Sequence, residues 1–96
     1  MAEYQITYWR DFPSMVVARN GVDTVKISLA NRFQEAIDEA AMRLNAADAD
    51  AYLDGWIRSE WTIEAGEAAE VAERISANLE NSLDEAALQA MLDKLS

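Results

Sequence analysis

The sequence predicts an α+β domain in which an antiparallel four-stranded sheet carries helices mainly on one face, in the order βββα-β-αα. Two observations predict this fold. Apolar and polar residues alternate in short runs over residues 3–29 and again over 56–65, which is the two-residue period of a half-buried strand. Between and after these runs, apolar residues recur every three or four positions, as in a helix packed along one side. Short connections between the first strands favour antiparallel pairing.

A segment containing proline separates the first two expected strands. Residues 3–9 alternate and form the first strand. Asp11-Phe12-Pro13-Ser14 is expected to be a turn, because proline cannot donate to a strand ladder and holds the preceding residue extended. The second strand is expected over residues 15–19.

The dipeptide Asn20-Gly21 predicts the next turn. Flanked by apolar runs, it favours a type I′ hairpin, in which both central residues have positive φ. A two-residue loop then pairs Arg19 with Val22 and starts a third strand over residues 22–29. The pairing predicts an apolar face (Val16, Ala18, Val25, Ile27 and Leu29) and a mixed face (Val17, Thr24, Lys26 and Ser28). We therefore expect a covered side and a wetter side of the sheet.

The first helix is expected over residues 32–45. Asn31 followed by Gln34 is typical of a helix N-terminus. The apolar stripe is formed by Phe33, Ile37, Ala40 and Leu44, and we expect it to lie on the apolar face of the sheet. Asp48 is expected to cap one or two further helical turns that end at Gly55.

A fourth strand is expected over residues 56–65. Strict alternation places Trp61 with Ile57 and Ile63 in the core, and Trp56 with Arg58 on the opposite face. A helix follows over residues 67–80, with the stripe Ala68, Val71, Ala72, Ile75 and Leu79.

The last helix is expected to open with a capping box formed by Ser82 and Glu85. Its apolar stripe consists of Leu83, Ala87, Leu88, Met91, Leu92 and Leu95. We divide the chain into an α+β domain (residues 1–81) and a C-terminal helix (residues 82–96). This helix either docks on the domain or binds a partner, including a second copy in a homodimer.

Composition excludes several classes of function. The chain has 96 residues, no Cys, no His and a formal net charge of −10. No disulfide, no thiolate or imidazole metal site and no Cys–His or Ser–His pair can form. So acidic a chain is not expected to bind nucleic acid. No apolar run has the length of a membrane span, and the N-terminus lacks a signal-peptide layout. We expect a cytoplasmic protein with no cofactor and no membrane association.

The negative charge lies in the second half of the chain. Residues 1–44 hold five basic and six acidic residues, whereas residues 45–96 hold three basic and twelve acidic ones. These carboxylates form either a solvated helical face or a docking surface for a basic partner. Asp48, Asp50 and Asp54 lack the glycine and the glutamate of a calcium loop. Glu60 and Glu64 lie about 13 Å apart on a strand, too far for an acid pair.

The most informative local sequence is Trp9-Arg10-Asp11-Phe12-Pro13. An aromatic ring, a guanidinium and a carboxylate at the end of a strand can bind a peptide by stacking and paired hydrogen bonds. The alternative is that Trp9 and Phe12 close one end of the core. Trp56 and Arg58 present the same choice, and Trp56 is the better candidate for an exposed contact. These seven residues are the candidate binding site.

Several short motifs within residues 4–66 resemble a small bacterial domain family labelled "virulence factor". They are Tyr8-Trp9-Arg10-Asp11-Phe12-Pro13, Arg32-Phe33, Ala36-Ile37-Asp38, Ala40-Ala41-Met42 and Asp50-Ala51-Tyr52-Leu53. The family occurs alone in proteobacteria and attached to helical-repeat proteins in some Gram-positive bacteria. Solitary versions tend to be encoded beside folate and corrinoid methyl-transfer enzymes. The resemblance implies an accessory protein of one-carbon metabolism, supplies no catalytic residues and leaves the last helix outside.

Two function classes follow. The first is a non-enzymatic binding or accessory module that holds a protein partner with the mixed sheet face and the candidate residues. The second is a small accessory subunit or enzyme of folate and corrinoid metabolism that acts through carboxylates. A concave pocket with two or more convergent carboxylates would favour the second class.

Overall fold

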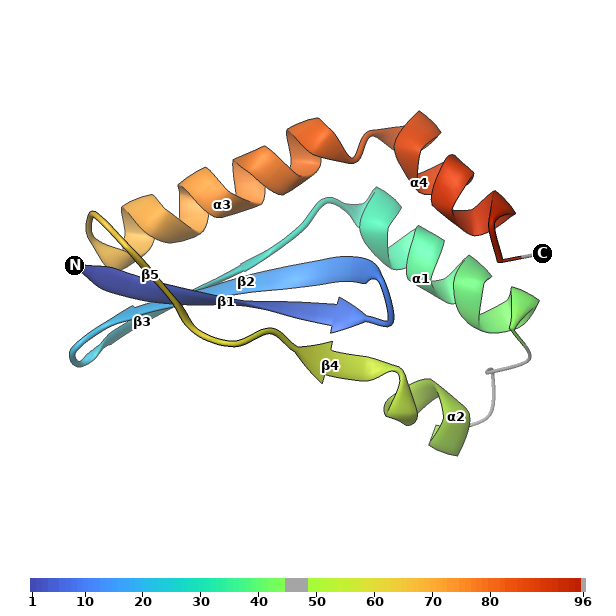
Figure 1. The fold of residues 1–96 in the computed structure, drawn as a ribbon, viewed down its shortest axis with the longest axis horizontal. Coiled ribbons are helices and arrows are strands. Elements are labelled where there is room, and N and C mark those ends of the chain that lie inside the picture. Colours follow the sequence, from blue (N-terminus) through green and yellow to red (C-terminus); the bar gives the residue numbers. More distant parts are fainter. Residues whose placement is uncertain (45–48, 96) are drawn as a thin grey trace.

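The computed structural model describes residues 1–44 and 49–95 and has the expected α+β architecture (Figure 1). In chain order its elements are β1 (Ala2–Trp9), β2 (Phe12–Asn20), β3 (Asp23–Ser28), α1 (Asn31–Arg43), α2 (Ala49–Asp54), β4 (Trp56–Arg58), β5 (Thr62–Glu64), α3 (Ala68–Ser82) and α4 (Glu85–Asp93). The helix expected to end at residue 45 ends at Arg43. Residue 45 and the expected cap Asp48 lie outside the described residues.

The sheet is antiparallel, with the strand order β3-β2-β1-β4. β5 also pairs with β1, so β4 and β5 share one edge of that strand. α3 packs against β1, β2 and β3, and it covers more of the sheet than α1, which was expected to provide the cover. Figure 1 shows α1, α3 and α4 on one side of the sheet, while α2 lies beyond the end of β1.

The hairpin between β2 and β3 has a different register from the expected one. Asn20 pairs with Asp23 and Arg19 with Thr24, so the central turn residues are Gly21 and Val22. Gly21 has φ +63°, whereas Val22 does not have a positive φ. The turn therefore lacks the two positive φ angles of type I′ and has the pattern of type II′, with glycine first. The register differs by two residues, and a shift of two leaves the faces unchanged.

The turn between β1 and β2 consists of Arg10 and Asp11 and lies earlier than expected. Arg10 has φ 52°, and its backbone N–H donates to the Gly55 carbonyl at 2.7 Å. Pro13 lies within β2 and is buried, contrary to the expected turn at residues 11–14. Thr7 pairs with Met15 and Tyr8 with Pro13, so one extra residue of β2 bulges here. A bulge tolerates the missing N–H of proline.

The expected single strand over residues 56–65 is interrupted. Thr7 and Glu3 are four positions apart on β1, whereas their partners, Arg58 and Ile63, are five positions apart. One extra residue is therefore inserted between β4 and β5. A one-residue insertion reverses the faces of all following side chains. The expectation that Ile57, Trp61 and Ile63 share a buried face is wrong: Ile57 and Ile63 are 55% and 66% exposed, and Trp61 is only half-buried.

The core lies between the covered sheet face and the helices. The expected stripe of α1 is confirmed, since Phe33, Ile37 and Ala40 are buried and Leu44 is half-buried. The prediction that Asn31 caps the N-terminus of α1 is wrong. Ala30 occupies that position without a side-chain hydrogen bond, and the Gln34 amide instead donates to Asp38 at 3.0 Å.

The last helix docks on α1 through its apolar stripe. Leu88 and Leu92 are buried in the core. The N-cap of α4 is Asp84, whose carboxylate accepts from the Ala87 N–H at 2.9 Å; the expected cap, Ser82, is the last residue of α3. The expected apolar stripe of α3 is confirmed as well, since Val71 and Ala72 are fully buried.

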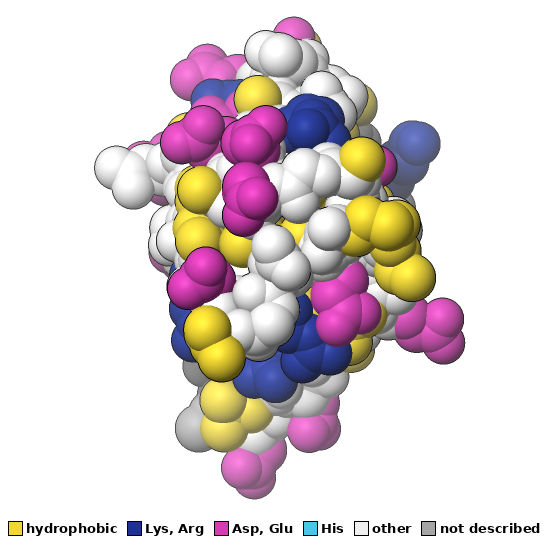
Figure 2. Space-filling model, turned by 90° about the vertical axis from the view of Figure 1, so that its left-hand side faces the viewer, with side chains coloured by type: hydrophobic (Ala, Val, Ile, Leu, Met, Phe, Trp, Pro, Cys, Tyr) yellow, Lys and Arg dark blue, Asp and Glu magenta, His cyan; other side chains and the backbone are white. Residues whose placement is uncertain are grey.

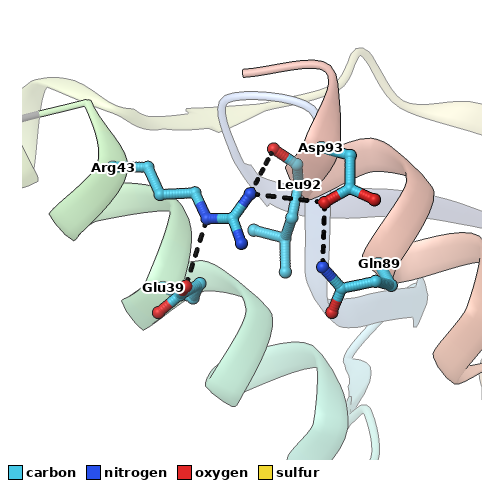
Figure 3. Close-up of polar contacts among 5 residues, drawn as sticks. All are labelled: Glu39, Arg43, Gln89, Leu92 and Asp93. Atoms are coloured by element: carbon cyan, nitrogen blue, oxygen red, sulfur yellow. Dashed lines mark hydrogen bonds and ion pairs between the residues drawn. The ribbon is translucent and has the colours of Figure 1, made fainter. Parts of the chain in front are cut away.

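Arg43 of α1 holds the C-terminal end of α4 (Figure 3). Its guanidinium contacts the Glu39 carboxylate at 3.1 Å and donates to the Leu92 carbonyl at 3.0 Å. It also lies 3.5 Å from the Asp93 carboxylate, which accepts from the Gln89 amide at 3.0 Å. A cation on the terminal carbonyls of a helix opposes the helix dipole favourably.

Candidate functional site

The sheet face opposite α3 contains a hollow of ≈ 210 Å³. Its lining residues come from β1, β2, β3, β4 and the connection between β4 and β5: Gln5, Thr7, Met15, Val17, Arg19, Thr24, Lys26, Arg58 and Trp61. None of them is buried. We call these nine residues the open-face hollow. The mixed face expected from Val17, Thr24 and Lys26 is thus confirmed as the less covered side of the sheet.

Strand geometry explains why these residues converge. Side chains of cross-strand partners point to the same face, and the partners Gln5–Val17, Val17–Lys26 and Thr7–Arg58 all lie in the hollow. Trp61 is three residues from Arg58, a spacing that places side chains on opposite faces in a regular strand. The extra residue between β4 and β5 corrects this difference and brings Trp61 to the same face as Arg58.

Ser59 supports this irregular edge. Its N–H donates to the Ile6 carbonyl, and its hydroxyl accepts from the Ile6 N–H, each at 2.9 Å. The Gln5 amide donates to the Ser59 carbonyl at 3.0 Å. These bonds replace the ladder that the bulge interrupts, so the backbone leading to Trp61 stays attached to β1.

Arg19 and Trp61 form the best-defined contact of the hollow. The Arg19 guanidinium lies 3.8 Å from the centroid of the Trp61 ring, within the range of a cation–π interaction. The Nε of Arg19 also contacts the Glu3 carboxylate at 2.7 Å. Arg19 is therefore held in place from two sides, and its charge is partly compensated.

Lys26 and Arg58 are the uncompensated cations of the hollow. Both are exposed, and within residues 1–44 and 49–95 neither forms an ion pair. Among the residues that the structure describes, no carboxylate lines the hollow. A chain of net charge −10 thus carries a locally positive sheet face.

Three of the expected binding residues belong to the core. Trp9, Phe12 and Pro13 are all at least 98% buried, so their side chains cannot contact a partner. The Trp9 indole N–H donates to the Tyr52 carbonyl at 2.7 Å, and the two rings lie 5.8 Å apart. The alternative interpretation, in which Trp9 and Phe12 close one end of the core, matches this placement.

The other expected residues are more accessible but do not form one cluster. Arg10 and Asp11 are exposed at the turn, and the Arg10 guanidinium lies 5.3 Å from the Trp9 ring centroid. Trp56 is half-buried and packs edge-to-face on Tyr52 at 5.9 Å. Trp56 and Arg58 line a second hollow with Thr7 and Ile57. Arg58 is therefore the expected site residue that also belongs to the open-face hollow.

A separate groove of ≈ 350 Å³ lies between α1 and α4. Among its lining residues are the carboxylates Glu35, Glu39 and Glu85. Glu39 contacts Arg43, and Glu35 and Glu85 are exposed. Within the described part of the chain, no group of three or more Asp or Glu side chains is arranged to hold a metal ion, and no helix is long and apolar enough to cross a membrane.

Comparison with known proteins assigns the family. A family model described as "Virulence factor" matches residues 7–92. The chain belongs to this family. The Virulence factor match includes nearly all of α4, so the expectation that the last helix falls outside the family is wrong. No curated protein and no solved structure gives a significant match.

Proposed function

We propose that this member of the Virulence factor family is a non-enzymatic binding module that holds a negatively charged protein partner on its open-face hollow. The observation that carries the proposal is the grouping of Arg19, Lys26 and Arg58 with Trp61 in one hollow whose described lining residues include no carboxylate. Guanidinium and ammonium groups bind carboxylates through charge-assisted hydrogen bonds. An indole adds rigid apolar contact area.

The charge distribution supports an acidic partner more strongly than a nucleic acid. Within the described residues, Lys26 and Arg58 have no ion pair to break before they bind a carboxylate. A polyanion such as DNA, in contrast, approaches the whole molecule, whose net charge of −10 repels it. A short acidic segment of a protein contacts only the local positive face.

The second candidate is a carboxylate-based accessory subunit or enzyme of one-carbon metabolism. The groove between α1 and α4 favours it, because a concave site of a few hundred Å³ with several carboxylates was the expected discriminator. Glu35 and Glu85 are exposed, however, and no surrounding structure desolvates them for acid–base chemistry. We therefore rank this candidate below the binding module.

Isothermal titration calorimetry with octaglutamate tests the proposal. Binding is expected at low ionic strength, and it should weaken as salt screens the contacts. Lys26→Glu should reduce the affinity about tenfold or more, since a charged hydrogen bond is replaced by a repulsion.

Lys94→Glu is the matched control, because Lys94 is exposed at the end of α4 and the substitution gives the same net charge. The proposal is wrong if octaglutamate does not bind, or if the Lys26 and Lys94 variants lose affinity equally. Equal loss would show that only the overall charge matters.

A further inference from the structure

Three depressions adjoin one another along β1. The open-face hollow shares Thr7 and Arg58 with the second hollow, which Trp56 and Ile57 complete. At the other end it shares Arg19 with a depression of ≈ 270 Å³ formed by Met1, Ala2, Glu3, Asn20, Gly21 and Ile63. We call these three depressions together the β1 trough.

The ends of the β1 trough are apolar and its centre is cationic. Met1 and Ile63 are 82% and 66% exposed at one end, and the half-buried Trp56 lies at the other, on the same face as Arg58. Between them lie the uncompensated cations Lys26 and Arg58. Exposed apolar side chains gain free energy when a partner covers them, and the cations between them favour a negatively charged partner.

Figure 2 looks onto the end that carries the N-terminus and the β2–β3 turn. A group of basic side chains lies in the lower part of this view, and hydrophobic side chains lie beside and below it in separate groups. Glu3 contacts Arg19 near this end, so the unpaired positive charge is concentrated further along, at Lys26 and Arg58.

We infer that the β1 trough binds an extended segment of about eight residues with an acidic centre and large apolar side chains at both ends. The length follows from β1, whose eight residues span roughly 25 Å. The hydroxyls of Thr7 and Thr24 on the floor can bond to the backbone of an extended chain. This inference rests on the proposed function, and it specifies the chemistry of the partner.

Fluorescence anisotropy with two octapeptides tests the inference. Both carry four central glutamates and the same dye; one has two leucines at each end and the other has serines there. We expect the leucine peptide to bind about tenfold more tightly, since burying even one leucine side chain contributes this much.

Variants separate the open face from the opposite one. Ile63→Ser should reduce the affinity for the leucine peptide and leave the affinity for the serine peptide unchanged. Ile57→Ser should change neither affinity, because Ile57 pairs with Tyr8 and points to the opposite face. Val22→Ser is the matched control, because Val22 is 98% exposed and lines none of the three depressions. Substituting such exposed residues should leave the fold intact.

Each outcome separates this inference from the proposed function. Equal affinity for the two peptides would overturn the inference while the acidic partner stands. If neither peptide binds, the proposed function fails with it. Tighter binding of a single-stranded DNA of eight nucleotides than of either peptide would also overturn the inference, because phosphate recognition would then explain the cationic centre.

Discussion

Gly55 is the position at which the packing of the core predicts the largest effect of a single added methyl group. A Cβ atom at Gly55 would overlap the Trp9 indole nitrogen and lie 2.5 Å from Cε2 of the same ring. The ring is fully buried and bonded to the Tyr52 carbonyl, and the Gly55 carbonyl accepts from the Arg10 N–H. Neither the ring nor the backbone can move away freely.

Gly55→Ala should therefore lower the free energy of unfolding by about 1–3 kcal/mol, the usual cost of overpacking a core. For a domain of this size the midpoint of thermal unfolding should fall by roughly 5–20 °C. Circular dichroism during heating, with a urea titration, measures both quantities.

Two variants make this prediction specific. Val22→Ala is the control, since Val22 is 98% exposed and shortening its side chain opens no cavity in the core. Combining Gly55→Ala with Trp9→Leu should cost less than the sum of the single changes, because the overlap disappears. The reasoning is refuted if Gly55→Ala destabilises the chain no more than Val22→Ala, or if the effects of Gly55→Ala and Trp9→Leu simply add.

Three further predictions concern the helices and the covered face. Burial, with a contribution from Tyr4, raises the pKa of Tyr8 above 10.0. The protonated phenol then favours the folded state, so its stabilisation is complete below about pH 10 and is lost as the pH rises through the higher folded-state pKa. With Tyr8→Phe, the free energy of unfolding measured by urea titration should fall less steeply as the pH rises above 10. An unchanged dependence on pH would show that ionisation of Tyr8 does not cause the alkaline loss of stability. Arg43→Ala should destabilise the chain by about 1 kcal/mol, and hydrogen exchange should show faster exchange of the amides of α4 before those of other helices. An equal acceleration in all helices would contradict the role of Arg43 in holding α4 on α1. Because Leu88 and Leu92 are already buried against α1, we expect light scattering to give the mass of a single chain. The mass of a dimer would favour the alternative, in which α4 binds a second copy of the chain.

Side-chain periodicity predicts the faces of the first three strands well. Val16, Ala18 and Leu29 are buried as expected, and Lys26 lies on the opposite side. This assignment survives the wrong register of the β2–β3 hairpin, because the error is two residues and strand faces repeat every two residues. Gly21 determines the turn more directly than Asn20, since Gly21 alone has positive φ there.

Bulges explain most of what the sequence did not reveal. A single inserted residue between β4 and β5 moves Trp61 from an expected core position onto the open face, and no local residue pattern in 59–61 announces it. The same limit applies to Pro13, which sits in β2 beside a bulge instead of in a turn. Trp61 was consequently missed as a candidate site residue, and with it the stacking of Arg19 on its ring, the best-defined contact of the hollow.

The position of the Trp61 indole N–H signal in an NMR titration with the leucine-ended acidic octapeptide tests the central claim most directly. The account predicts that this signal shifts with increasing peptide, while the signal of the Trp9 indole, buried and bonded to Tyr52, stays in place. A stationary Trp61 signal, with the peptide instead perturbing amides along α1 and α4, would contradict it.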